Sequence, residues 1–160
     1  MKFLPVCEST GGACLRTSAL TGWKQISVAD RFFDTNVLIY LLSAVAAKAD
    51  LIEEKLAEGA TVSVQVLNEF ASVALRKLGM NVTEIREALD PITAICHVVP
   101  LTIEIHRRGL QVAERYRFSF YDALIVAAAL ESSCTMLYTE DLQDGQVIDD
   151  TLTIRNPFRP

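Results

Sequence analysis

A chain of 160 residues has the usual length of one domain, and a hydrophobic content of 51% is enough to bury a substantial core. A formal net charge of −5 at pH 7 argues against a protein that holds nucleic acid through a global basic field, although it allows local basic patches. The four cysteines form no Cys-x-x-Cys pair, which indicates neither a zinc site nor a disulfide framework and fits reduced thiols in the cytoplasm.

The first 30 residues lack a sustained hydrophobic period and contain three glycines, which predicts an appendage outside the core. Their apolar stretch is broken by Pro5 and by polar residues, so it makes a poor secretory signal and a cytoplasmic location is expected. We therefore expect an N-terminal extension at residues 1–30 and a single domain at residues 31–160.

From residue 31 onward, short apolar runs alternate with segments of helical period. The first half predicts a strand at 31–33, a polar turn at 34–36, helices at 37–42 and 48–58, a strand at 62–64 and a helix at 65–78. Gly59 and Gly79 are expected to end the second and third of these helices.

The second half continues this alternation. It predicts a helix from a cap at Asn81 or Thr83 to about residue 95, bent at Pro91, then a strand at 97–99, helices at 102–116 and 119–130, and a strand at 135–139. The tail at 147–154 is expected to add one or two edge strands. Strands that alternate with helices predict an α/β fold with a parallel sheet covered by helices on both faces.

The segment Ser119–Leu130 is apolar on every side, which predicts a helix that is buried all round. Its longest apolar run falls well short of the roughly 18 residues of a membrane span, so no transmembrane segment is expected. Its one charge is Asp122, and a carboxylate in an apolar setting must be paired, protonated or bound to a cation. Alternatively, Ser119 and Asp122 have the spacing of a capping box, in which Asp122 serves its own helix end.

Four acidic residues follow the predicted strands: Asp34, Glu69, Asp122 and Asp141. Because the carboxyl ends of parallel strands lie beside the amino ends of the helices that follow, we expect these acids to approach one another at one edge of the sheet. Oxygen ligands of this kind favour Mg²⁺ or Mn²⁺. Such a site suits metal-assisted phosphodiester cleavage.

Each acid also has a purely structural interpretation. Asp34 could cap the helix that follows it, and Glu69 could be a solvated residue on a helix edge. Acids at positions 141 and 144 are typical of turns. The histidines, His97 and His106, show no pattern of a zinc site or a nucleophile triad and are expected to be structural.

Four segments carry a family resemblance, namely Phe33–Leu38, Gln65–Phe70, Ser119–Ile125 and Tyr138–Gly145. In this order they resemble the motifs of PIN-domain ribonucleases, and especially of VapC-type toxins from prokaryotic toxin–antitoxin modules. The resemblance runs from Arg31 to Phe158. It implies a PIN-like three-layer α/β fold, with a mostly parallel central sheet of four or five short strands flanked by helices.

The resemblance also implies a cytoplasmic endoribonuclease that depends on Mg²⁺ or Mn²⁺, forms a homodimer and is inhibited by a cognate antitoxin. The implied products carry a 5′-phosphate and a 3′-hydroxyl. The implied catalytic and metal-binding residues are Asp34, Glu69, Asp122 and Asp141, and the supporting residues are Asn36, Ser119, Thr139 and Asp144. Asp144 is also an alternative to Asp141 as the fourth acid, although Asp141 follows the strand sooner.

The N-terminal segment departs from the family pattern. The first thirty residues have no counterpart at the usual start of the family, and are either a real extension or the product of an upstream start codon.

RNA that crosses an acidic site needs cations elsewhere, and the candidates are Arg76, Lys77, Arg107, Arg108 and Arg115. A solvated helix face is an equally open interpretation of these five.

Other functions stay open. The strongest alternative is a catalytically inactive PIN-like module that binds RNA or protein and keeps its carboxylates for folding. A DNA nuclease of similar architecture would use the same metals. A phosphatase of the haloacid-dehalogenase type is weaker, because Asn36 stands where those enzymes need a second aspartate.

Overall fold

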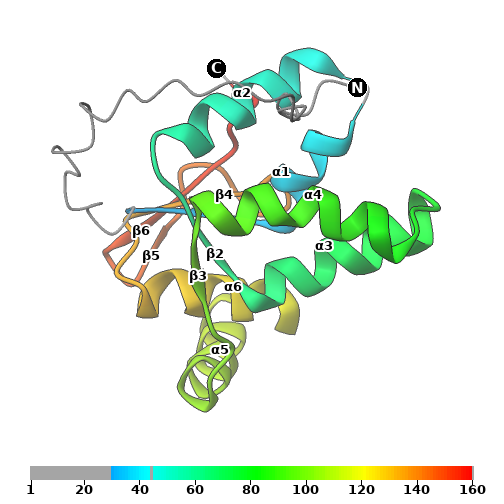
Figure 1. Ribbon diagram of the computed structural model, residues 1–160. Coiled ribbons are helices and arrows are strands. Elements are labelled where there is room, and N and C mark those ends of the chain that lie inside the picture. The colour runs from blue at the N-terminus through cyan, green and yellow to red at the C-terminus, as the bar shows by residue number, and fades with distance from the viewer. Residues whose placement is uncertain (1–29, 44, 160) are drawn as a thin grey trace, which may run out of the picture.

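The protein is built around a central sheet (Figure 1). The computed structural model describes residues 30–43 and 45–159. Six strands are found in this part of the chain: β1 (Arg31–Phe33), β2 (Thr61–Ser63), β3 (His97–Val99), β4 (Met136–Tyr138), β5 (Val147–Ile148) and β6 (Leu152–Arg155). Their order is β3-β2-β1-β4-β6-β5, and only the β5–β6 pair is antiparallel. The mostly parallel α/β sheet is therefore confirmed.

The C-terminal tail differs from its prediction. It was expected to form edge strands, but β6 pairs with β4 on one side and β5 on the other, so only β5 lies at the edge. Leu152 and Ile154 are fully buried, and this burial of apolar side chains favours an inner position of β6 in the sheet. This adds a strand to the four or five that were expected.

The helices are α1 (Thr35–Leu38), α2 (Ala46–Ala57), α3 (Val64–Lys77), α4 (Val82–Ile95), α5 (Ile103–Tyr116) and α6 (Phe120–Glu131), and a 3₁₀ turn at Ile39–Leu42 follows α1. In Figure 1, α5 and α6 lie on one side of the sheet and α2 on the other, while α3 and α4 run side by side. The polar turn expected at 34–36 is shorter than predicted, because Asp34 caps α1 and the helix already begins at Thr35.

Helix ends follow local side-chain chemistry. Asn81, not Thr83, caps α4, and it forms a capping box with Glu84. Gly59 and Gly79 come just after α2 and α3 with positive φ angles of 105° and 67°, which glycine adopts at little cost. The predicted ends of both helices are therefore confirmed.

Helix α6 is the buried core helix that its sequence predicts, since residues 123–129 are all buried. It packs closely against α5 at Gly109, where an added Cβ would lie 2.8 Å from Cδ2 of Leu124. A side chain at Gly109 would therefore force Leu124 to move. This close packing gives the first turn of α6, which carries Asp122, a rigid support.

Asp30 contacts the start of β4, because its carbonyl oxygen accepts hydrogen bonds from the backbone N–H groups of Thr135 (2.7 Å) and Met136 (3.0 Å). The rest of the predicted extension, residues 1–29, lies outside the described residues, so its division from the domain stays a prediction. In the part of the chain that the structure describes, no helix has the length and apolar character needed to cross a membrane.

Candidate active site

Asp34 lies where β1 passes into α1, and its backbone is held by a hydrogen bond from its N–H to the carbonyl of Tyr138 at 3.0 Å. One carboxylate oxygen, Oδ1, accepts from the N–H of Thr35 at 2.5 Å and caps α1. The other, Oδ2, accepts from Thr139 Oγ1 at 2.7 Å and from Asn36 Nδ2 at 3.0 Å. Asp34 is only 5% exposed, so its capping role leaves it a fixed, buried carboxylate.

The pKa of Asp34 is raised from 3.8 to about 7, chiefly because burial disfavours the charged form. Hydrogen bonds from Thr139 and from the backbone of Thr35 act in the opposite direction. The negative charges of Glu69 and Asp122 raise this pKa further. Asp34 therefore lies within electrostatic reach of two of the other predicted acids.

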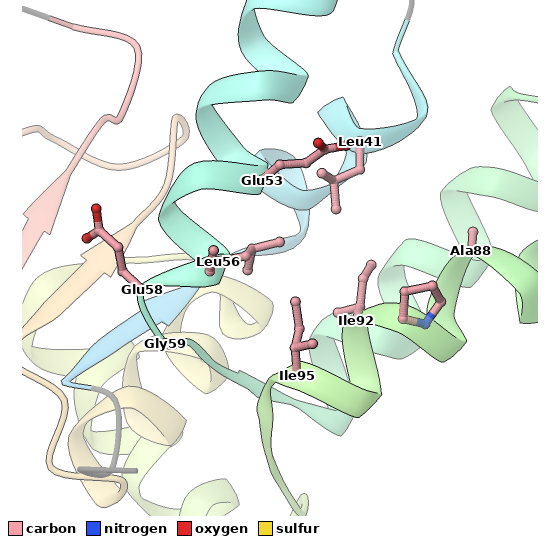
Figure 2. Close-up of a pocket in the computed structure, with 10 residues that line it drawn as sticks. Leu41, Glu53, Leu56, Glu58, Gly59, Ala88, Ile92 and Ile95 are labelled. Atoms are coloured by element: carbon pink, nitrogen blue, oxygen red, sulfur yellow. The ribbon is translucent and has the colours of Figure 1, made fainter. Parts of the chain in front are cut away.

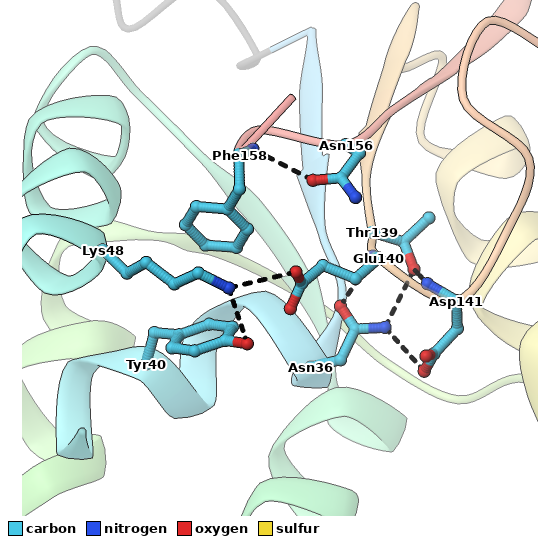
Figure 3. A network of polar contacts seen from close by, with 8 residues as sticks. All are labelled: Asn36, Tyr40, Lys48, Thr139, Glu140, Asp141, Asn156 and Phe158. Atoms are coloured by element: carbon cyan, nitrogen blue, oxygen red, sulfur yellow. Dashed lines mark hydrogen bonds and ion pairs between the residues drawn. The ribbon is translucent and has the colours of Figure 1, made fainter. Parts of the chain in front are cut away.

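Asn36 contacts a third predicted acid, Asp141 (Figure 3), as well as Asp34. Its Nδ2 donates to Oδ2 of Asp34 (3.0 Å), to Oγ1 of Thr139 (2.9 Å) and to Oδ2 of Asp141 (2.8 Å), the last of which lies 105 residues away in the sequence. Its Oδ1 accepts from the N–H of Glu140 at 3.2 Å. The side chain of Asn36 thus bridges the chain after β1 and the chain after β4.

Asp144, the alternative to Asp141, has a different contact. Its Oδ1 accepts from the backbone N–H of Asn156 at 2.8 Å and so ties the loop after β4 to the C-terminal tail. Asp141 shares the Asn36 amide with Asp34. These contacts favour Asp141 as the fourth acid.

Asp122 lies in the first turn of α6 and is half-buried, just before the buried apolar residues 123–129. Ser119 caps this helix by accepting from the N–H of Asp122 at 3.2 Å. The Ser119 hydroxyl donates to Oδ2 of Asp122 at 2.6 Å. The Ser119 half of the predicted capping box is therefore present, and the carboxylate of Asp122 has a hydroxyl partner at its own helix end.

Replacing Ser119 with glycine should separate its role as a helix cap from its role as a partner of the Asp122 carboxylate. Glycine is a tolerated N-cap that costs only about a few tenths of a kcal/mol, so thermal unfolding should change little. The hydroxyl that orients Asp122 is lost, and we expect Mn²⁺ affinity to fall by about tenfold, as for other partners of metal ligands. Calorimetric titration with Mn²⁺ measures this, and an affinity equal to that of the wild type would remove Ser119 from the site.

Glu69 lies in the second turn of α3 and is half-buried. Its Oε1 accepts from Nε2 of Gln65 at 2.7 Å. Sequence reasoning missed Gln65, although two residues four apart on a helix are neighbours and the pairing could have been found from that spacing. Thr35 also links α1 to α3, because its Oγ1 donates to the carbonyl of Val66 at 3.3 Å.

Three acids lie around Asp34, with Asp141 sharing the Asn36 amide and Glu69 and Asp122 within electrostatic reach, but the four do not form a ready metal cage. Among residues 30–43 and 45–159, no three histidine, cysteine, aspartate or glutamate side chains are placed so that they could hold a metal ion. The available donors are carboxylate, amide and hydroxyl oxygens, which suit hard cations such as Mg²⁺ and Mn²⁺. The donor chemistry fits such an ion, and the four-carboxylate metal site stays a prediction.

The predicted RNA-binding cations are dispersed. Arg108 and Arg115 on α5 both pair with Asp149, with N···O distances of 2.5 Å and 2.7 Å, and the hydroxyl of Tyr116 also donates to this carboxylate at 2.8 Å. These contacts tie α5 to the turn between β5 and β6. Arg76 on α3 donates from Nε to the carbonyl of Ser72 at 3.3 Å. With Lys77 and Arg107, their contact with RNA stays a prediction.

An apolar groove of about 510 Å³ lies between α2 and α4 (Figure 2). Its walls include Leu56 from α2 and Ala88, Ile92 and Ile95 from α4, with the carboxylate of Glu53 among them. The candidate acids are not part of its lining. Its apolar character suits a protein surface more than a phosphate backbone.

The sequence model of the PIN domain family matches residues 31–143. No curated protein matches the sequence significantly. The matched segment contains the four predicted acids, together with Asn36, Ser119 and Thr139.

Solved structures with the same fold include a bacterial toxin and a toxin–antitoxin complex. VapC20 of Mycobacterium tuberculosis, described as a sarcin–ricin loop cleaving toxin, has a TM-score of 0.58 and 20% identity over 69% of this chain and 89% of its own. A toxin–antitoxin complex from Klebsiella pneumoniae has a TM-score of 0.61 and 20% identity over 81% and 99% of the two chains. FitAcB of Neisseria gonorrhoeae has a TM-score of 0.58 and 17% identity over 81% and 99%. At these identities the likeness is one of fold.

Proposed function

This chain belongs to the PIN domain family, and from that premise we propose that it is an endoribonuclease that depends on Mg²⁺ or Mn²⁺ and acts as the toxin of a toxin–antitoxin pair. One observation carries the proposal: a buried carboxylate, Asp34, is joined through Asn36 to Asp141 and lies within electrostatic reach of Glu69 and Asp122. Such a concentration of acids is unfavourable for folding alone, which supports a functional role.

In this proposal the cation is held by Asp34, Glu69, Asp122 and Asp141, directly or through water. When bound, a divalent cation supplies positive charge for the phosphate and makes water more acidic. These four carboxylates offer no nitrogen or sulfur ligand, which supports Mg²⁺ or Mn²⁺ over zinc.

The chain's own polar residues fix the acids in place. Thr139 and Asn36 donate to the same oxygen of Asp34, and Thr139 also accepts from the N–H of Asp141 at 3.2 Å. These contacts restrict both carboxylates before substrate arrives, so little ordering is required during the reaction. Asp34 must lose its proton to hold a cation, and its raised pKa means that this costs most below neutral pH.

A protein partner and a second copy belong to the same proposal. Solved toxin–antitoxin complexes are among the structures that share this fold, which supports an antitoxin partner. A basic antitoxin side chain would pair well with the acids around Asp34. Homodimerisation, a cytoplasmic location and a domain at residues 31–160 preceded by an appended segment complete this interpretation.

A second function is favoured by one observation. Because no three acids in the described residues are placed to hold a metal ion, the chain could be an inactive PIN-like module that binds RNA or protein. Such a module would bind RNA equally well in the presence of a chelator. The two functions therefore differ in what EDTA does.

The deciding experiment uses the purified full chain, freed of any bound partner protein. It is incubated with a mixed pool of single-stranded RNA in Mn²⁺ or Mg²⁺, beside an EDTA control, a single-stranded DNA pool and total cellular RNA. Cleavage of RNA that EDTA abolishes is the expected result. Intact RNA in every arm, together with RNA binding that EDTA does not change, would support the inactive module instead.

A further inference from the structure

Lys48, on α2, is enclosed by groups from three other parts of the chain (Figure 3). Its Nζ lies 4.0 Å from the ring centroid of Tyr40 and 4.1 Å from that of Phe158. The ammonium also donates to the hydroxyl of Tyr40 at 2.8 Å and to Oε1 of Glu140 at 3.2 Å. The two rings meet edge to face, with centroids 4.8 Å apart. Aromatic and carboxylate contacts together hold the ammonium in one place.

The Lys48 enclosure, made of Tyr40, Glu140 and Phe158, joins distant segments of the sequence. Tyr40 comes from the 3₁₀ turn after α1, Glu140 from the loop after β4, and Phe158 from the C-terminal tail. The side chains of Lys48 and Glu140 are 31% and 25% exposed. Lys48 is therefore committed to protein contacts and is a poor candidate for free binding of a phosphate.

Glu140 connects this enclosure to the acid site. Its side chain is held by Lys48, while its backbone N–H donates to Oδ1 of Asn36 at 3.2 Å. That bond requires the amide of Asn36 to present Nδ2 to Asp34 and Asp141. The reversed amide would turn its oxygen toward two carboxylates and its nitrogen toward the N–H of Glu140, and both contacts would be repulsive.

The ion pair with Lys48 has a second role, because it compensates the negative charge of Glu140. Glu140 precedes Asp141, so an unpaired carboxylate there would add another anion beside a site that has to accept a polyanion. The pKa of Lys48 is raised, first by the hydrogen bond to Tyr40 and also by Glu140, so the side chain stays an ammonium at neutral pH.

We propose that Lys48 is a positioning residue of the candidate active site: by holding Glu140 it sets the orientation of the Asn36 amide and, through it, the carboxylates of Asp34 and Asp141. The proposal rests on the proposed nuclease function only for its catalytic consequence. The orientation of Asn36 can be measured without metal, RNA or activity.

The C-terminal tail supports the same enclosure. Asn156 accepts from the N–H of Phe158 at 2.9 Å, and its own N–H is held by Asp144 at 2.8 Å. These bonds place the ring of Phe158 over Lys48. Asp144 therefore acts on the site from a distance, as an anchor of the tail.

The first test measures solvent exchange of the Asn36 side-chain amide protons by NMR in the metal-free full chain. Lys48→Met keeps a long apolar side chain against the two rings but removes the ion pair, and we expect exchange to be about fivefold faster or more. Glu140→Gln keeps the backbone N–H and removes the same ion pair, so it should have the same effect. Arg86→Met, which removes a positive charge from an exposed position of α4, is the matched control and should leave exchange unchanged.

The second test is kinetic. Lys48→Met is expected to lower kcat by about tenfold with KM changed by less than about twofold, because a positioning residue affects the geometry of the acids. Lys48→Arg keeps the charge, can lie against the same rings and can pair with Glu140, so it should restore kcat to within about twofold of the wild type. In the double variant with Glu140→Gln, the losses in kcat should not add, because both residues act on Asn36 through the same ion pair.

Three outcomes would overturn the proposal. One is unchanged Asn36 exchange in both Lys48→Met and Glu140→Gln. Another is a raised KM with a salt dependence of RNA affinity reduced by about one ion, which would mean that Lys48 contacts phosphate directly. The third is full additivity of the two substitutions. A wild type that cleaves nothing would contradict the nuclease function, while the exchange measurement would still decide the role of Lys48.

Discussion

Asp34→Asn is expected to abolish metal-dependent RNA cleavage, with kcat/KM lowered by at least about 100-fold, because even the outer partners of metal ligands cost about 10- to 100-fold. The neutral amide keeps an oxygen that can accept from the N–H of Thr35 and cap α1, so the fold should survive. The negative charge that would attract a cation is lost. Cleavage assays over a range of Mn²⁺ concentrations measure the effect, with circular dichroism to verify folding.

The same variant should change how stability depends on pH. Burial raises the pKa of Asp34 from 3.8 to about 7, so between these values the unfolded chain is ionised at this residue while the folded chain keeps its proton. The folded state then binds one more proton, and the free energy of unfolding falls as pH rises through this window. Above about pH 7 both states are ionised and the full penalty of burying the charge is present.

Urea unfolding of the metal-free protein tests this relation. The free energy of unfolding of the wild type should fall relative to that of Asp34→Asn as pH rises from about 4 to about 7, and the difference should then level off. Mn²⁺ affinity of the wild type should rise over the upper part of the same range, because the ion displaces the proton. Parallel stability profiles for the two proteins would mean that Asp34 is ionised throughout and that its burial has little effect.

Elements with a strong local pattern could be predicted from the sequence. The all-round apolar segment at 119–130 is the buried helix α6, and the short run at 31–33 is the central strand β1. Both follow from burial alone, since an element that is covered on all sides has no polar face to alternate with. The match of the PIN family model to residues 31–143 agrees with the family that the four segments indicated.

Boundaries that depend on a single polar contact could not be predicted in this way. The helix after β1 starts two residues earlier than expected because the carboxylate of Asp34 accepts from the N–H of Thr35. The choice of Asn81 over Thr83 as the cap of α4 rests on the reciprocal bond with Glu84. The inner position of β6 depends on pairing with β4, which local periodicity does not contain.

The polar network of the site could be predicted from the sequence only in part. The resemblance suggested that Asn36 helps to position Asp34, and a hydrogen bond between them is present at 3.0 Å. The contacts of Lys48 with Glu140 and Phe158 could not be predicted, because they join segments far apart in the sequence; Glu140 lies in the fourth resembling segment, but that segment does not identify its partner. Contacts of this kind depend on tertiary packing, and a single sequence does not reveal them.

The role of the basic residues on α5 could not be predicted from the sequence either. Arg108 and Arg115 were candidates for RNA binding, but both pair with Asp149 in the turn between β5 and β6. Asp149 adopts a positive φ of 45°, which aspartate tolerates better than most residues. A carboxylate 34 residues or more along the chain can therefore take up cations that appear free in the sequence.

The identity of the fourth acid gives the second prediction of large effect. Asp141→Asn should lower kcat/KM by at least about 100-fold, because it removes a negative charge that shares the Asn36 amide with Asp34. Asp144→Asn should lower it by only about threefold or less, since the amide oxygen can still accept from the N–H of Asn156 and keep the tail in place.

This pair is a controlled comparison, because the two variants carry the same chemical change three positions apart in one loop. The change in net charge is the same, so once circular dichroism verifies that both variants fold, the ratio of their kcat/KM values reports position. Mn²⁺ titration should follow the same order, with weaker binding only in Asp141→Asn. Equal losses would mean that the loop acts through its total charge, and the reverse order would make Asp144 the fourth acid. In that case the bond from Asp144 to Asn156 would have to break for the site to form, and the tail that carries Phe158 would have to move with it.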